Sequence, residues 1–89
     1  SSEGHLLYAR ALEALGDVPA ALHEYEALAQ GYPGEEGRAR YAQLLQRDGQ
    51  LDKAQAVFAE ILKRSSTSPD YYRRNQREWI DLAKRESRA

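Results

Sequence analysis

The chain has 89 residues, which suits a single domain, and its 42% hydrophobic and 30% charged residues exclude a disordered segment. A formal net charge of −1 excludes a strong overall field that would draw nucleic acid or a membrane surface. Because there is no cysteine, a disulfide framework and a thiolate metal site are excluded, and no apolar run has the length of a membrane span.

The composition favours an all-α fold. Alanine, leucine, glutamate and arginine dominate, and all four are good helix formers. Two valines and two isoleucines are too few for a sheet, in which β-branched residues are enriched.

The first predicted helix carries Tyr8, Leu12 and Leu15 at i, i+4 and i+7, a spacing that places them on one helical face. Gly16 follows directly, and glycine readily takes the left-handed conformation that ends a helix. We therefore expect the first helix to end at this glycine and to bury the face that contains Tyr8.

A second helix is expected after this turn. Asp17 is the predicted N-cap, and Pro19 falls in the first turn, where its missing N–H costs nothing. Pro33 and Gly34 end the helix. Its apolar face is predicted to contain Leu22, Tyr25, Leu28 and Ala29.

The next stretch repeats this plan, with Asp48 and Gly49 at the turn between two helices. The first of these helices carries the apolar residues Tyr41, Ala42, Leu44 and Leu45. The second carries Ala54, Val57, Phe58, Ile61 and Leu62, the strongest amphipathic stretch of the chain.

A polar run over residues 65–68 then separates a fifth helix. Ser68 is a suitable N-cap, Pro69 suits the first helical position, and an acid follows near the positive end of the helix dipole. We predict one continuous helix over about residues 69–87, with Tyr72, Trp79, Leu82 and Ala83 on or near one face.

The chain matches itself at an offset of 33 residues, which indicates an internal repeat. The matching pairs are Tyr8 with Tyr41, Ala9 with Ala42, Leu12 with Leu45, Gly16 with Gly49, Ala21 with Ala54, Tyr25 with Phe58 and Leu28 with Ile61. Small residues at these positions let two antiparallel helices approach closely beside a large aromatic ring.

With these residues the chain resembles the tetratricopeptide repeat family, in which a helix-turn-helix of about 34 residues recurs. The resemblance rests on Ala9, Leu12, Gly16, Ala21, Tyr25 and Pro33 in one unit and on Ala42, Leu45, Gly49, Ala54 and Phe58 in the other. It departs from the family where His5 and Arg38 replace a large aromatic residue. It implies one domain over residues 1–89, with repeats at about 5–34 and 35–66, a capping helix at about 69–87, and five helices in a right-handed superhelical array.

The resemblance implies a non-catalytic scaffold that binds a peptide or partner helix in a concave groove. By alignment with the family, the groove residues are Leu6, Arg10, Glu13, Ala39, Gln43, Gln46, Arg73 and Arg77, with Ile80 nearby. Because guanidinium groups bind carboxylates in a bidentate way, Arg73 and Arg77 point to an acidic protein or peptide partner. The alternative for this basic face is a solvated surface with local ion pairs, Arg74 with Glu78 and Arg77 with Asp81.

Two other functions stay open. Nucleic acid could bind the basic end of the chain, which carries Arg73, Arg74, Arg77, Lys84, Arg85 and Arg88. The acids Glu78, Asp81 and Glu86 interrupt this basic face, and we therefore expect no nucleic-acid binding. The third possibility is a terminal cap of a longer array that has no ligand of its own.

No catalytic, cofactor or metal site is predicted. His5 and His23 form no metal-binding motif, and no serine stands in a recognisable nucleophile–base pattern. We expect Trp79 to pack against Phe58, Ile61 or Leu62 rather than to anchor a partner.

The resemblance extends to bacterial proteins with C-terminal repeats, some of which are anchored to a membrane by an N-terminal segment. We therefore expect a cytoplasmic fragment of a longer protein, with no membrane insertion by these residues. We expect a monomer, or a weak homodimer formed through an apolar patch of Leu6 and Leu7.

Overall fold

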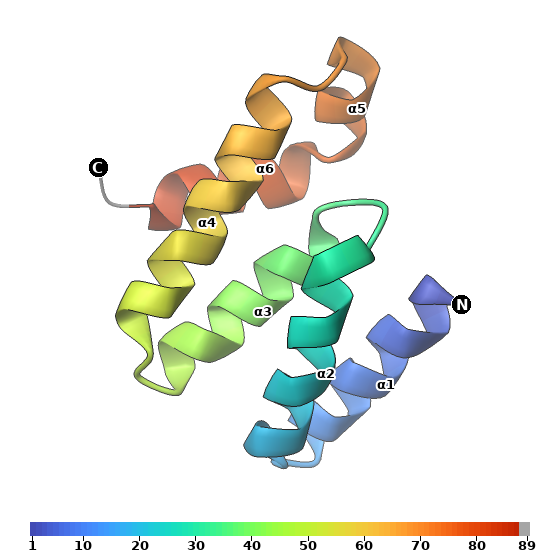
Figure 1. The fold of residues 1–89 in the computed structure, drawn as a ribbon, viewed down its shortest axis with the longest axis vertical. Coiled ribbons are helices and arrows are strands. Elements are labelled where there is room, and N and C mark those ends of the chain that lie inside the picture. The colour runs from blue at the N-terminus through green and yellow to red at the C-terminus, as the bar shows by residue number, and fades with distance from the viewer. Residues whose placement is uncertain (88–89) are drawn as a thin grey trace.

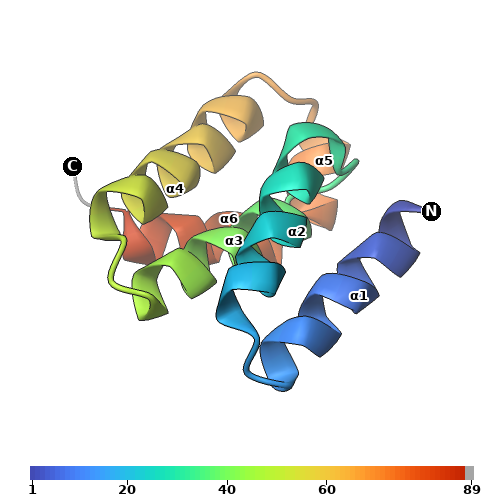
Figure 2. The same cartoon turned by 60° about the horizontal axis from the view of Figure 1, so that its bottom comes forward.

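The computed structural model describes residues 1–87, which form six α-helices and no strand (Figure 1). The helices are α1 (Ser2–Ala14), α2 (Val18–Gly31), α3 (Glu36–Arg47), α4 (Leu51–Ser66), α5 (Asp70–Asn75) and α6 (Arg77–Glu86). Figures 1 and 2 show two antiparallel hairpins, α1–α2 and α3–α4, with α6 beside the second. The all-α class is confirmed. None of the helices in residues 1–87 combines the length and the apolar character that a membrane span needs.

Both hairpin turns are built in the same way. Gly16 and Gly49 have φ values of +84° and +82°, in the left-handed region that only glycine enters without strain. After each glycine, the next amide donates to the carbonyl five residues back, from Asp17 at 3.0 Å and from Gln50 at 2.9 Å. These bonds define a Schellman helix end, so the predicted glycine stops are confirmed.

The start of α2 also agrees with the sequence. The Asp17 side chain accepts from the backbone N–H of Ala20 at 3.3 Å, and Pro19 lies in the first turn. The helix ends at Gly31, before the Pro33–Gly34 pair.

The core lies where the two hairpins and α6 meet. Tyr25 and Phe58, which the repeat places in equivalent positions, are both completely buried. The small residues that allow close helix packing, Ala9, Ala21, Ala42 and Ala54, are completely buried as well. Ile80, Leu82 and Ala83 of α6 close the core on the side of α4 and α3. The apolar faces predicted for α2, α3 and α4 are therefore the faces that form the core.

The face predicted for α1 needs correction. Leu6 and Ala9 are buried and Leu12 is partly buried, so this helix packs on α2 through its other side. Tyr8 and Leu15, which were expected inside, lie largely in solvent. The periodicity was ambiguous because α1 has apolar residues on both faces.

The predicted continuous helix over residues 69–87 is also corrected, since it is divided into α5 and α6 at Gln76. Its N-cap is Pro69 and not Ser68, whose hydroxyl instead donates to the carbonyl of Arg64 at 2.8 Å. The bend at Gln76 lets α6 pack along α4 and α3 while α5 reaches the loop between α2 and α3 (Figure 1).

Candidate partner-binding surface

One polar depression lies between α1 and α3 and has a volume of about 420 Å³. Its lining side chains are Glu13, Arg40, Gln43, Gln46 and Arg47. Three of these, Glu13, Gln43 and Gln46, were predicted as groove residues, and the structure brings them together.

Several of these side chains are held in place by neighbouring helices. The Glu13 carboxylate accepts from the Tyr25 hydroxyl at 2.7 Å and forms an ion pair with Arg47. The Gln46 amide donates to the Glu86 carboxylate of α6 at 3.0 Å. Gln43 is half-buried and makes no hydrogen bond through its side chain within residues 1–87, so its amide is available to a ligand.

Trp79 adjoins this depression through a contact with Arg40, whose guanidinium carbon lies 5.1 Å from the centroid of the indole ring. The Arg40 Nε also donates to Glu36 at 2.8 Å, which fixes the guanidinium over the ring. Trp79 is half-buried and packs against the edge of the core. Its expected burial is therefore found in part, and its ring also lies against α3 through Arg40.

A second depression, with a volume of about 370 Å³, starts at Trp79. It lies between the beginning of α1, the loop after α2, and the α5–α6 bend, and its apolar walls are Tyr32, Pro33, Tyr72 and Trp79. Because Arg40 lines the first depression and Trp79 the second, the two form one surface across α1, α3 and α6. We call these two depressions together the α1–α3–α6 surface.

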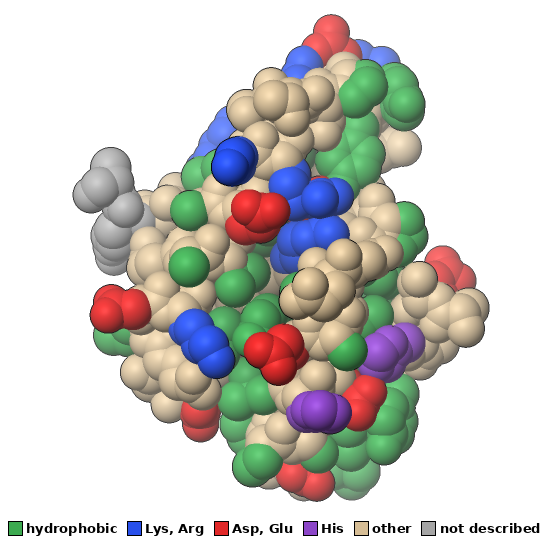
Figure 3. Space-filling model, viewed as in Figure 1, with side chains coloured by type: hydrophobic (Ala, Val, Ile, Leu, Met, Phe, Trp, Pro, Cys, Tyr) green, Lys and Arg blue, Asp and Glu red, His purple; other side chains and the backbone are tan. Residues whose placement is uncertain are grey.

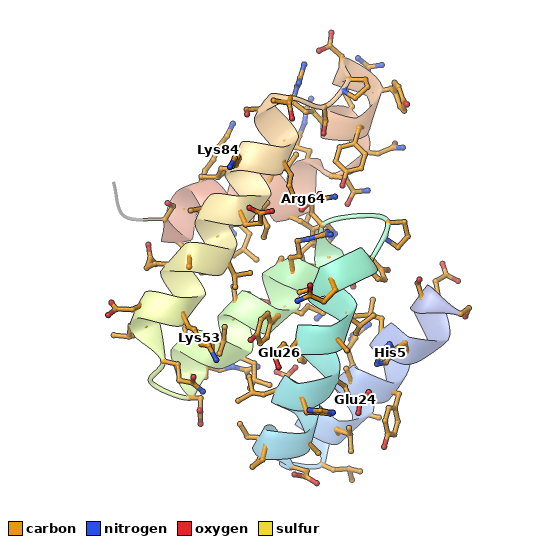
Figure 4. The ribbon with its side chains drawn as sticks, in the orientation of Figure 1. His5, Glu24, Glu26, Lys53, Arg64 and Lys84 are labelled. Atoms are coloured by element: carbon orange, nitrogen blue, oxygen red, sulfur yellow. The ribbon has the colours of Figure 1, made fainter. Side chains whose placement is uncertain are left out.

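A buried polar cluster at the loop after α2 supports this surface, and sequence analysis did not find it. Glu35 is 0% exposed, and its carboxylate accepts from the Tyr72 hydroxyl and from Arg64 Nε, the latter at 3.3 Å. Arg38 is buried beside it, with Nη1 3.6 Å from Glu35 Oε1. Figure 4 shows Arg64 reaching from α4 toward this loop. Glutamate has a strong preference for the surface, so no local pattern could indicate this burial.

Arg38 is held by main-chain carbonyls as well. Its Nη1 donates to the carbonyl of Gly34 at 2.7 Å and to that of Tyr32 at 3.3 Å. The arginine that departs from the repeat family's aromatic residue thus closes the end of α2 onto α3. Glu35 Oε1 has no hydrogen-bond partner within the described residues, so the ion pair with Arg38 is its compensation.

The electrostatics of this cluster follow from burial. Burial lowers the pKa of the Arg38 guanidinium, although the Glu35 carboxylate acts in the opposite direction. For Arg64, burial opposes the charge, but Glu35 and the hydrogen bonds to Tyr72 and Glu35 outweigh it and raise the pKa. Burial and then the bond to Glu35 raise the pKa of the Tyr72 phenol. The cluster therefore holds a neutral phenol between opposite charges.

Arg73 and Arg77 lie in a different depression, of about 570 Å³, at the α5–α6 bend. Its lining residues are Asp70, Arg73, Arg74, Arg77, Ile80, Asp81 and Lys84, none of which lines the first two depressions. Arg73 pairs with Asp70 and donates to the Ser65 carbonyl at 3.2 Å. The structure thus separates these two arginines from the other predicted groove residues.

The ion pairs expected on this basic face, Arg74 with Glu78 and Arg77 with Asp81, are not formed in residues 1–87. Arg74, Arg77 and Lys84 therefore carry charges without an ion-pair partner in the described part of the chain. Arg88, the last basic residue of the predicted set, lies outside the described residues.

The remaining predicted residues divide by exposure. Leu6 and Ala39 are buried, at 5% and 0% exposure, so their assignment to a partner-facing surface is corrected. Ile80 is also buried apart from an edge in the basic depression. Arg10 is exposed and lies close enough to the Tyr25 hydroxyl to influence its pKa. The expected Leu6–Leu7 patch is divided as well, because only Leu7 is exposed.

The histidines remain surface residues. His5 Nε2 lies 2.7 Å from a Glu24 oxygen, and Figure 4 shows the two side chains facing each other across α1 and α2. Residues 1–87 contain no group of three or more histidine, aspartate or glutamate side chains arranged to hold a metal ion.

Comparison of the chain with protein-family models, with curated protein sequences and with solved structures gives no match. The resemblance to the tetratricopeptide family therefore rests on the repeated residues themselves.

Proposed function

We propose that the chain is a non-catalytic scaffold of the tetratricopeptide type that binds a peptide or helix of another protein on the α1–α3–α6 surface. The repeated turns at Gly16 and Gly49 support this arrangement. In it, α1 and α3 are the first helices of two repeats, α6 takes the place of a third, and the array has the right-handed superhelical path of the family.

The observation that carries the proposal is the continuity of polar and aromatic side chains through the Arg40–Trp79 contact. The depression beside Arg40 offers amide and guanidinium groups, and the one beside Trp79 offers aromatic walls. Such a combination binds an extended segment by hydrogen bonds and ring contacts. Since Glu13 and Glu36 compensate Arg47 and Arg40, recognition depends more on hydrogen bonds than on net charge.

Selection from a displayed peptide library followed by fluorescence titration tests this proposal. Trp79 is the only tryptophan, so its emission reports directly on the surface. We expect selected peptides to change this emission, and Gln43→Ala together with Arg47→Ala to weaken binding at least about tenfold. The matched control is Lys53→Ala, on the exposed start of α4 (Figure 4).

Either of two results contradicts the proposal. One is a selection that enriches no sequence, which favours the terminal cap without a ligand. The other is a peptide whose affinity the Gln43 and Arg47 variants leave unchanged while circular dichroism shows that they are folded.

A specific observation keeps a second candidate, binding of an acidic segment or of nucleic acid at the α5–α6 bend. Arg74, Arg77 and Lys84 lie in one depression without ion-pair partners among residues 1–87. Phosphate contacts through these three residues would make affinity for nucleic acid fall steeply with salt. Titration with single-stranded and duplex DNA at low and moderate salt checks this, and no binding at low salt excludes nucleic acid.

A further inference from the structure

The outward face of α1 is entirely apolar. Leu7, Tyr8 and Leu15 are 62%, 55% and 82% exposed, and Gly4, Ala11 and Ala14 of the same face are also exposed. The other large exposed hydrophobic residues in residues 1–87, Leu51 and Tyr71, lie on α4 and α5. Figure 3 shows hydrophobic side chains gathered at the lower right, over the region of α1 in Figure 1. Such a patch on a small domain marks an interaction surface.

The spacing on this face suits another helix. Gly4, Tyr8, Ala11 and Leu15 follow each other by steps of four, three and four residues, the alternation found where two helices pack along a seam. Alanine and glycine between the larger side chains allow the partner backbone to come close.

The second repeat shows that a helix does cover the equivalent face. Thirty-three residues further on, Gly37, Tyr41 and Leu44 of α3 are buried, and α2 packs on α3. A Cβ atom at Gly37 would lie only 3.1 Å from Cγ of Tyr32, which measures how closely α2 approaches. On α1 the same positions, Gly4, Tyr8 and Ala11, have no such cover.

A second copy offers one matching surface. Its α2 is already covered by α3 and its α4 by α6, so neither is free to receive α1. The remaining apolar helix face is its own α1. Because this face has no charged residue, two copies meet without burying a charge.

We propose that α1 packs antiparallel against α1 of a second copy, about a twofold axis at Ala11. In this register Leu7 meets Leu15 of the partner subunit, Tyr8 covers Ala14 of the partner subunit, and Ala11 meets its own equivalent. Large side chains thus oppose small or aliphatic ones, and the helices cross where the side chains are smallest.

This contact goes beyond the proposed scaffold function. At 100° per residue, Glu13 lies 200° around the helix from Ala11, so the peptide surface and the dimer seam are on nearly opposite sides of α1. A single pair of short helices buries less than the roughly 1,200 Å² of a standard interface, so the dimer is weak and depends on concentration.

The absence of cysteine makes a disulfide trap specific. Under mild oxidation, we expect Ala11→Cys to form a covalent dimer at least about tenfold faster than Ala59→Cys, because a twofold axis at residue 11 brings the two sulfurs together. Ala59 is an exposed alanine on α4 and is the matched control.

Light scattering over a concentration series completes the test. We expect the mass to rise from one chain toward two, and Leu15→Glu to keep the protein monomeric with unchanged circular dichroism. Three outcomes overturn the proposal: a monomer at every concentration, a dimer that Leu15→Glu leaves intact, and growth beyond two chains, which would indicate head-to-tail stacking. The Gln43 and Arg47 variants should still dimerise, so this proposal and the peptide proposal fail independently.

Discussion

The backbone N–H of Glu35 donates to the side-chain oxygen of Gln76 at 2.8 Å, across 41 residues of sequence. This bond fixes the end of the α2–α3 loop at the point where the last predicted helix divides. It also explains the glycine at position 34, where a Cβ atom would lie 2.7 Å from the same Gln76 oxygen. The loop and the bend therefore depend on each other.

Replacing Gln76 should loosen this junction. In Gln76→Ala the Glu35 amide loses its acceptor, and we expect the free energy of unfolding to fall by about 1–2 kcal/mol. Urea unfolding followed by circular dichroism measures this, with the exposed Gln30→Ala as control. Gly34→Ala should cost less in the Gln76→Ala background than alone, because its clash is then removed. Additive effects of the two changes would contradict the contact.

Two neighbouring glutamates should differ strongly in their contribution to stability. Glu35→Ala leaves Arg38 buried without its carboxylate partner, and we expect a loss of about 3 kcal/mol. Glu36→Ala removes a partly exposed pair with Arg40, and we expect a loss of about 0.5 kcal/mol. Denaturant unfolding of both variants checks the difference, and equal losses would mean that the carboxylate of Glu35 is not buried as described.

The protein should lose stability in alkali because of its buried tyrosines. Burial raises the pKa of Tyr25 above the ordinary 10.0, although Arg40 and Arg10 act in the opposite direction. Below pH 10 both folded and unfolded chains keep this phenol neutral, and its contribution is complete. Above that pH the unfolded chain loses the proton first, so stability falls as pH rises.

Burial likewise raises the pKa values of Tyr32, Tyr41 and Tyr72, so the alkaline loss should be steep. Tyr25→Phe removes one of these protons, and the slope of unfolding free energy against pH above 10 should become shallower. Urea unfolding at neutral pH and at several alkaline pH values separates this effect from the lost hydrogen bond to Glu13. A slope that the substitution leaves unchanged would argue against ionisation of Tyr25 as a cause.

Sequence reasoning succeeded where the signal is local. A glycine after a helix, an aspartate before one and the periodic face around Phe58 act through neighbours on the same element, so residue type and spacing predict them. The clustering of Glu13, Gln43 and Gln46 followed in the same way from the repeat.

Reasoning failed where burial depends on a distant segment. Glu35 becomes a buried residue only because Tyr72 and Gln76 fold back onto it, and no local pattern encodes that contact. For α1, residues on both faces are apolar, so periodicity could not decide whether Tyr8 or Leu6 would lie inside. That choice belongs to the packing of α2, which accepts the narrower face around Ala9.

The two turn glycines should respond equally to substitution, and a third glycine should respond in the opposite direction. A Cβ atom at Gly16 or Gly49 would meet nothing within 4 Å, so alanine there costs only the left-handed backbone, about 1 kcal/mol each. Gly31 is helical and also has open space, so Gly31→Ala should stabilise by up to about 1 kcal/mol. Urea unfolding measures all three variants. Losses that differ by more than about 0.5 kcal/mol between the turns would show that they are not equivalent, and with them the repeat would lose its physical basis.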